Sequence, residues 1–171
     1  MNSLVILGSS SFLGRVLLNN ISSDLLVKAI VREVPADADR YAKKVEWIKL
    51  DIINVSSLIK IFKKGDVVIN LIHIKDKNRN ANINLINHIT DACIYSKILR
   101  LIHCSTASVV GDHESNYINE LTPCNPKTTY EKVKMEVEKI VLNCSSKGID
   151  VGILRPTAIV GHGGKNLKKL S

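Results

Sequence analysis

The sequence predicts a doubly wound parallel α/β sheet in three layers. Short apolar runs bounded by turn residues alternate with longer runs of helical periodicity, which is typical of parallel strands joined by helical crossovers. Aromatic residues make up only 4% of the composition, whereas branched aliphatic residues are abundant, as expected for strands buried on both faces. A chain of 171 residues is long enough for one domain with a full core.

The expected elements follow from this pattern in order. Strands are expected at residues 4–7, 26–31, 45–50, 67–73, 100–104 and 150–155. Helices are expected at residues 12–21, 55–62, 80–96 and 126–143. The segment 34–44 contains Pro35 and several charges, so it is expected to be a loop or a weak helix.

The net charge of +8 raises the question of nucleic-acid binding. The basic residues are spread along the chain, often in pairs, with little aromatic interleaving that could stack bases. We therefore expect a solvated basic surface, part of which favours a phosphorylated cofactor, and no nucleic-acid partner.

The sequence also argues against a membrane protein and a metal site. No apolar run approaches the roughly 20 residues that span a bilayer, and the N-terminus lacks the pattern of a signal peptide. We therefore expect a cytoplasmic location and no membrane partner. The four cysteines lack metal-ligand spacing, which predicts reduced thiols and no bound metal.

The first strand passes through a turn of small residues, from Gly8 to Gly14, directly into a helix. A helix N-terminus offers unpaired N–H groups and partial positive charge, which favours a bound phosphate. Gly8 would form the tight turn, and Gly14 would let the helix pack closely against the strand. An ordinary strand–turn–helix connection without a ligand is the alternative.

This turn resembles that of the extended short-chain dehydrogenase/reductases, the family of NAD(P)-dependent nucleotide-sugar epimerases and dehydratases. The resemblance covers residues 3–164 and implies a Rossmann-type cofactor-binding domain over residues 1–164, with 165–171 as a tail or the start of a substrate-binding region. Ser11 stands where the family usually has a third glycine, which tightens the approach to the pyrophosphate. The turn residues implied to bind the cofactor are Gly8, Ser10, Ser11, Phe12, Leu13 and Gly14.

Arg32 ends the second expected strand. At this position an arginine accommodates a 2′-phosphate, whereas a carboxylate favours a free 2′-hydroxyl. We therefore expect NADP to be favoured over NAD, although Glu33 is adjacent and a surface arginine is the alternative.

Further strand ends are implied by the resemblance to border the cofactor. Asp51 and Ile52 match the position that contacts adenine, although a turn or N-cap aspartate is equally consistent. Leu71 and Ile72 match the segment beside the pyrophosphate and ribose, and Pro156 precedes the residues that border the nicotinamide.

Tyr130 and Lys134 stand four residues apart in the helical run 126–143, so they share a helix face. Val137 and Val141 continue this face, which should partly bury both polar groups. An ammonium beside a phenol is expected to lower the phenol pKa from about 10. The pair matches the Tyr-x-x-x-Lys motif of the family, which implies Tyr130 as general acid/base and Lys134 as its tuner and ribose ligand.

Two more catalytic roles rest on the resemblance. The loop 105–111 matches the segment that holds the substrate oxygen, which assigns this role to the Thr106 hydroxyl. Asn82 matches the helix asparagine that holds the active-site lysine through water. His73 is expected to be a polar residue at a strand end rather than a catalytic base.

These features predict an NAD(P)-dependent oxidoreductase, epimerase or dehydratase that acts by hydride transfer on a sugar nucleotide or a similar secondary alcohol or ketone. The C-terminal substrate part of the family is apparently absent, so this chain could be inactive alone and should expose apolar surface. The resemblance also implies a homodimer through helices 80–96 and 126–143. A non-catalytic dinucleotide-binding sensor or assembly subunit is the alternative, because five residues depart from the catalytic pattern: Ser11, Ile72, His73, Val110 and Val160.

Overall fold

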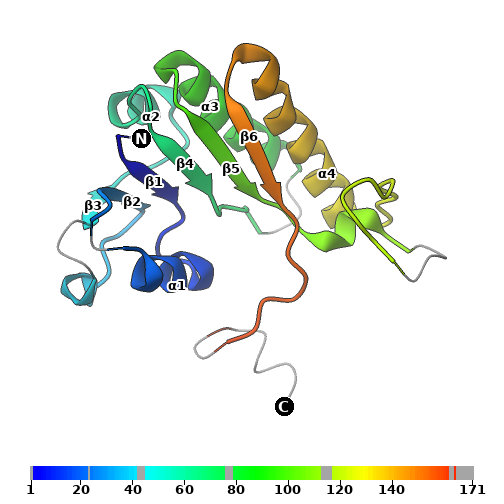
Figure 1. Ribbon diagram of the computed structural model, residues 1–171, viewed down its shortest axis with the longest axis horizontal. Coiled ribbons are helices and arrows are strands. Elements are labelled where there is room, and N and C mark those ends of the chain that lie inside the picture. The colour runs from blue at the N-terminus through cyan, green and yellow to red at the C-terminus, as the bar shows by residue number, and fades with distance from the viewer. Residues whose placement is uncertain are drawn as a thin grey trace.

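Six parallel strands form one sheet in the order β3-β2-β1-β4-β5-β6 (Figure 1). The computed structural model describes residues 2–22, 24–41, 45–75, 79–112, 117–161 and 164. The apolar runs of the sequence form the strands, because their side chains are covered when neighbouring strands and helices pack. The strands are β1 (Leu4–Leu7), β2 (Val27–Val31), β3 (Val45–Lys49), β4 (Val67–Asn70), β5 (Arg100–Cys104) and β6 (Asp150–Leu154).

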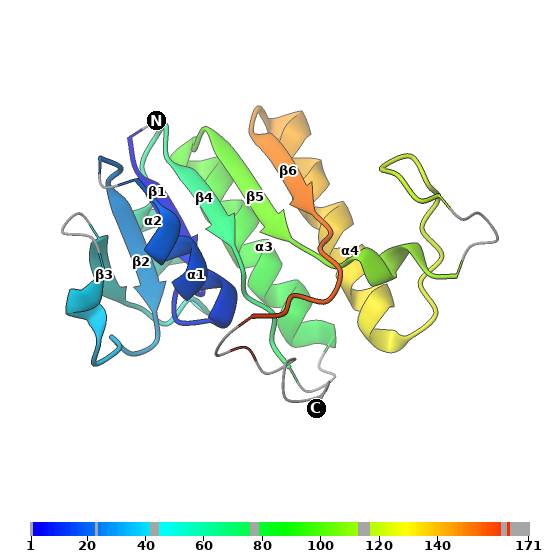
Figure 2. The ribbon, with the colours of Figure 1, turned by 60° about the horizontal axis from the view of Figure 1, so that its bottom comes forward.

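Helices cover the two faces of the sheet unequally (Figures 1 and 2). On one face, α1 (Phe12–Asn20) packs its Leu17 and Leu18 against β1 and β2. On the other face, α2 (Val55–Ile61), α3 (Arg79–Ser96) and α4 (Thr129–Leu142) enclose the larger core. Short 3-10 turns complete the described chain: η1 (Ala38–Arg40), η2 (Ala107–Val110) and η3 (Asn143–Lys147).

The predicted three-layer parallel fold is confirmed, with shifts of one residue at several element ends and of three residues at two of them. Helix α4 begins at Thr129 rather than 126 because Thr128 and Glu131 form a capping box, in which the Glu131 carboxylate also accepts the Lys127 N–H. Strand β4 ends at Asn70 rather than 73 because the Asn70 side chain accepts the Ile72 N–H at 3.0 Å. Residues 165–171 and the basic pairs at 43–44 and 168–169 lie outside the described residues.

The sheet face that carries α1 is less covered over β5 and β6. Ile102 is partly buried there, and Leu154 is 55% exposed. Val160, in the segment after β6, is 50% exposed. Among the described residues, no helix combines the length and apolar character needed to cross a membrane.

A buried carboxylate joins three elements at the amino ends of the strands. Asp66 is fully buried, and its Oδ1 accepts hydrogen bonds from the Ser3 N–H at 3.1 Å and the Ser3 hydroxyl at 2.8 Å. Its Oδ2 accepts the Lys63 N–H at 2.9 Å and lies 3.4 Å from Nζ of Lys28, a residue of β2. Both carboxylate oxygens are thus satisfied without solvent.

Candidate active site

The predicted site residues all lie at or just beyond the carboxyl ends of the strands, along one edge of the sheet. The chain direction reverses between β1 and β4, because β2 lies on one side of β1 and β4 on the other. In open parallel sheets, such a switch point is where ligands bind. Gly8 leaves β1 with φ +88°, and a Cβ atom there would lie 3.0 Å from Cγ1 of Ile72, which follows β4.

The turn after β1 is held in place from within. The Ser11 hydroxyl caps α1 by accepting the Gly14 N–H at 3.1 Å, and the Ser11 N–H donates to the Gly8 carbonyl at 3.0 Å. A Cβ atom on Gly14 would lie 2.6 Å from the Gly8 carbonyl oxygen, so only glycine fits there. The Phe12 ring packs against Gly161. A Cβ atom added to Gly161 would lie 2.8 Å from Cζ of the Phe12 ring. The segment after β6 therefore reaches the start of α1 (Figure 2).

The two strand ends predicted to hold adenosine are open to solvent. Arg32 follows β2 and is exposed. Asp51 is also exposed, and its Oδ1 accepts the Ile53 N–H at 3.2 Å, so it forms a turn, whereas the N-cap of α2 is Asn54. Ile52 is half-buried and packs against the large core.

Two arginines near this edge were not predicted from the sequence as site residues. Arg15 of α1 lies 3.9 Å from an Asp37 carboxylate oxygen, and Arg40 lies 3.8 Å from the same atom. The Arg15 Nε also donates to the Ser10 carbonyl at 3.3 Å. No spacing rule links these residues, because their proximity depends on how the 34–41 segment folds back.

The structure brings Thr106, Tyr130 and Lys134 together. Thr106 caps η2, directly after β5, and its hydroxyl hydrogen bonds the Tyr130 phenol. Tyr130 lies in the first turn of α4 and is 47% exposed, whereas Lys134, one turn later, is 3% exposed. The Lys134 Nζ donates to the Cys104 carbonyl at 2.9 Å, at the end of β5. Pro156 lies next to the Thr106 loop, because its carbonyl accepts the Ala107 N–H at 2.9 Å.

The predicted lowering of the Tyr130 pKa is wrong for this structure. Burial raises the pKa of the phenol above 10, although the hydrogen bond from Thr106 partly opposes this shift. The Lys134 ammonium is directed to the Cys104 carbonyl rather than to the phenol. Burial lowers the pKa of Lys134, against the raising influence of Cys104 and Glu138.

Asn82 is buried and holds the segment that follows β4. Its Oδ1 accepts the Ile74 N–H at 3.0 Å, and its Nδ2 donates to the Ile74 carbonyl at 2.9 Å. The amide therefore fixes the backbone beside His73. Its predicted role in holding Lys134 through water stays a prediction.

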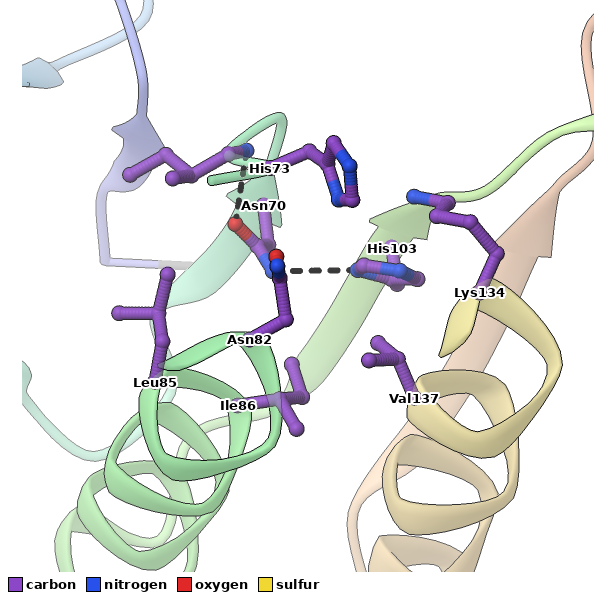
Figure 3. A pocket seen from close by; sticks show the side chains of 9 residues that line it. Asn70, His73, Asn82, Leu85, Ile86, His103, Lys134 and Val137 are labelled. Atoms are coloured by element: carbon purple, nitrogen blue, oxygen red, sulfur yellow. Dashed lines mark hydrogen bonds between the residues drawn. The ribbon is translucent and has the colours of Figure 1, made fainter. Parts of the chain in front are cut away.

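Two histidines complete the site, and the sequence analysis gave neither a catalytic role. His73 stands edge-to-face against the Tyr130 ring, with centroids 5.2 Å apart. His103 of β5 is 1% exposed, and its Nδ1 lies 3.1 Å from Nδ2 of Asn70 in β4. Both histidines line a small cavity of about 10 Å³ together with Lys134 and Asn82 (Figure 3). The sequence signal that could have identified His103 is its position within the otherwise apolar run 101–104.

Comparison with known proteins gives relatives of two kinds. The 3beta-hydroxysteroid-dehydrogenase/decarboxylase isoform 1 of Arabidopsis thaliana is 29% identical over 133 residues, which cover 71% of this chain and 30% of that protein. The UDP-N-acetylglucosamine 4-epimerase of Bacillus cereus has a TM-score of 0.75 at 22% identity, over 91% of this chain and 60% of that one. A putative epimerase from Burkholderia cenocepacia has a TM-score of 0.84 at 16% identity, over 97% and 57%.

These likenesses bear on fold and family. The structural neighbours confirm the Rossmann-type fold, and this chain spans a little over half of their length and 30% of the plant protein. The family model described as "NAD dependent epimerase/dehydratase family" matches residues 4–171. The predicted resemblance is therefore confirmed: the chain belongs to the NAD-dependent epimerase/dehydratase family.

Proposed function

We propose that this chain binds a nicotinamide dinucleotide at the carboxyl edge of the sheet, with NADP favoured, and interconverts a secondary alcohol and a ketone with Thr106, Tyr130 and Lys134. The observation that carries this proposal is the meeting of these three side chains beside the glycine turn at the strand switch point. A homodimer through α3 and α4, and a domain boundary at 164, stay predictions.

The turn after β1 fits a dinucleotide pyrophosphate. Gly14 lets the start of α1 pack directly against the backbone of Gly8 and Ser9, where any Cβ would clash, and the first turn of α1 carries no acidic residue. The first N–H groups of a helix lack helical acceptors and attract anions. The residues that would hold the cofactor are Gly8, Ser10, Ser11, Phe12, Leu13 and Gly14, with Leu71, Ile72 and Pro156 along the same edge.

The NADP preference is supported by charge at the exit of β2. Arg32 is exposed. Asp37, which follows it in the chain, is contacted by two further arginines, Arg15 and Arg40. Arginine binds phosphate with several donors in a fixed fork. Asp51 and Ile52 would border the adenine at the next strand end.

The chemistry assigns a separate task to each side chain. A bound nicotinamide would supply or accept the hydride at the substrate carbon. Thr106 would hold the substrate oxygen, and Tyr130 would transfer a proton at that oxygen. Because burial raises the pKa of the Tyr130 phenol, the protonated form is favoured, and it would donate to a carbonyl oxygen in the reducing direction. Lys134 would hold the nicotinamide ribose.

The substrate is proposed as a nucleotide sugar or a similar secondary alcohol. UDP-sugar epimerases share the fold, whereas the relatives matched by sequence are named as hydroxysteroid dehydrogenases and a sterol demethylase protein. These names point to two substrate classes, a UDP-sugar and a hydroxysteroid. Single-turnover assays with a UDP-hexose and a 3β-hydroxysteroid, followed by nicotinamide absorbance, separate the two.

The first test is a parallel titration with NADPH and NADH, followed by nicotinamide fluorescence. We expect tighter binding of NADPH and a loss of about 10- to 100-fold in Arg32→Ala, the size of a charged hydrogen bond. Arg100→Ala is the matched control, since Arg100 pairs with Asp150 at the opposite end of β5 and β6. Preference for NADH would remove the Arg32 assignment and leave the dinucleotide site.

A non-catalytic dinucleotide-binding subunit is the second candidate. It is favoured by the crowding of the turn, where Cγ1 of Ile72 lies 3.0 Å from the Cβ position of Gly8. Dinucleotide binding without hydride transfer to any tested carbonyl would support this candidate. Failure of a folded chain to bind either dinucleotide would reject both.

A further inference from the structure

Two buried donors face the cavity between β5 and α4. Asn70 Oδ1 accepts the Ile72 N–H at 3.0 Å, so its Nδ2 is the atom directed to Nδ1 of His103 at 3.1 Å. An amide nitrogen can only donate, so Nδ1 of His103 accepts and the ring proton resides on Nε2. This Nε2–H has no hydrogen-bond partner among the described residues.

The second donor is the Lys134 ammonium. It uses one hydrogen for the Cys104 carbonyl, which leaves two for other acceptors. Lys134 lines the same cavity as His103 and is 3% exposed. Two donors cannot satisfy each other, and unpaired buried donors cost about 1–3 kcal/mol each.

The cavity is suited to one acceptor that takes hydrogen bonds from both. Its volume of about 10 Å³ is close to what one water molecule needs, and its walls include Asn70, His73 and Asn82 besides the two donors. Figure 3 shows the His73 ring, the His103 ring and the Lys134 side chain converging on this space. Larger ligands are excluded by the apolar side chains of Leu85, Ile86 and Val137.

We propose that this cavity binds one internal water, which accepts hydrogen bonds from His103 Nε2–H and from the Lys134 ammonium and donates to the His73 ring. His103 thereby becomes a positioning residue that holds Lys134 from its buried side. His73 also contacts the Tyr130 ring, so it connects the cavity to the half-exposed phenol.

The charges around the cavity agree with this arrangement. Burial, Lys134 and His73 together lower the pKa of His103 to about 3, so the ring stays neutral and keeps its Nε2 proton as a donor. Burial, Lys134 and Lys75 lower the pKa of His73, so its ring keeps an acceptor nitrogen at neutral pH. The catalytic meaning of Lys134 rests on the proposed function, but the water site does not.

The test uses the full chain without cofactor. In ¹⁵N-labelled protein, we expect His103 to show the Nε2–H tautomer and a cross-relaxation peak between that proton and a long-lived water. In His103→Phe we expect the pKa of Lys134, followed by side-chain NMR, to fall further by about 1, the size of one lost hydrogen bond to a charge. His88→Phe is the matched control, because His88 also has an unpartnered buried ring nitrogen but does not line the cavity.

The wild-type spectrum decides the water site even if His103→Phe does not fold, and His103→Leu, which also lacks a donor, then replaces it. A His103 Nδ1–H tautomer, or an Nε2–H without a water contact, would overturn the proposal. An unchanged Lys134 pKa in a folded His103→Phe variant would overturn the positioning role. Because no dinucleotide is present, these outcomes are independent of whether the chain binds NADP.

Discussion

The two ends of the sheet each bury a polar group, but they treat it differently. At the amino end, Asp66 is fully buried, and four donors from β2 and the adjoining turns satisfy both its oxygens. At the carboxyl end, His103 and Lys134 are nearly as buried, yet the His103 Nε2 has no partner among the described residues.

This difference separates a network whose hydrogen bonds are complete from one that has a donor to spare. A buried charge whose partners are complete is costly to break and leaves no position for a ligand. A buried donor beside a small cavity has capacity left for a further acceptor such as water. The four predictions below test this contrast, from the largest expected effect to the smallest.

Asp66→Ala should destabilise the fold most. It leaves the Ser3 donors buried without an acceptor and the Lys28 ammonium with the Ile61 carbonyl but no counter-charge, and breaking a buried pair costs about 3–5 kcal/mol. Urea unfolding measures the loss. Asp150→Ala, which removes the half-exposed partner of Arg100, is the control and should cost less than about 1 kcal/mol. Equal losses in both variants would remove the amino-end network as a major source of stability.

His103 should make the fold sensitive to acid. Its pKa is about 3 in the folded chain and near 6.5 when unfolded, so the unfolded state binds more protons between these values. The stability from this group is therefore complete above about pH 6.5 and is lost as the pH falls toward 3. Between pH 7 and pH 5, the loss should be about 2 kcal/mol.

The measurement is urea unfolding at both pH values for the wild type, His103→Phe and His88→Phe. The difference between the two pH values should shrink in His103→Phe by the His103 contribution and persist in His88→Phe. An undiminished difference in His103→Phe would show that other groups account for it.

Ser11→Ala should cost about 1 kcal/mol, because it removes the N-cap hydrogen bond to the Gly14 N–H. Thermal unfolding measures this loss. Ser10→Ala changes an exposed neighbour in the same turn and should stay within about 0.5 kcal/mol. A Ser11→Ala variant as stable as Ser10→Ala would mean that the turn is held by Gly14 packing alone.

Tyr130→Phe should leave stability within about 0.5 kcal/mol, since the phenol is at a half-exposed site. Under the proposed function, hydride transfer should nevertheless slow by about 10²- to 10⁴-fold with dinucleotide affinity retained. Single-turnover absorbance gives the rate. A normal rate would remove Tyr130 as the acid/base group.

The sequence predicted what depends on local pattern. Apolar runs located the strands, and a motif of fixed spacing placed Tyr130 and Lys134 on one face of α4. It did not predict the Asn70–His103 pair, because these residues are 33 positions apart and meet through the register of β4 and β5. The same reason hid the Lys134 bond to Cys104, and the burial that raises the pKa of Tyr130 likewise depends on tertiary packing.

The central place of β1 has a consequence for biosynthesis. Strand β1 pairs with β2 on one side and with β4, residues 67–70, on the other. A nascent chain that leaves the ribosome N-terminus first therefore carries its fully apolar first strand with one open edge until β4 follows. Pairing between strands distant in sequence is slow, and open apolar edges associate with other chains. Of these six strands, β1 is thus synthesised first, yet it is paired on both sides only after β2, β3 and β4 have followed.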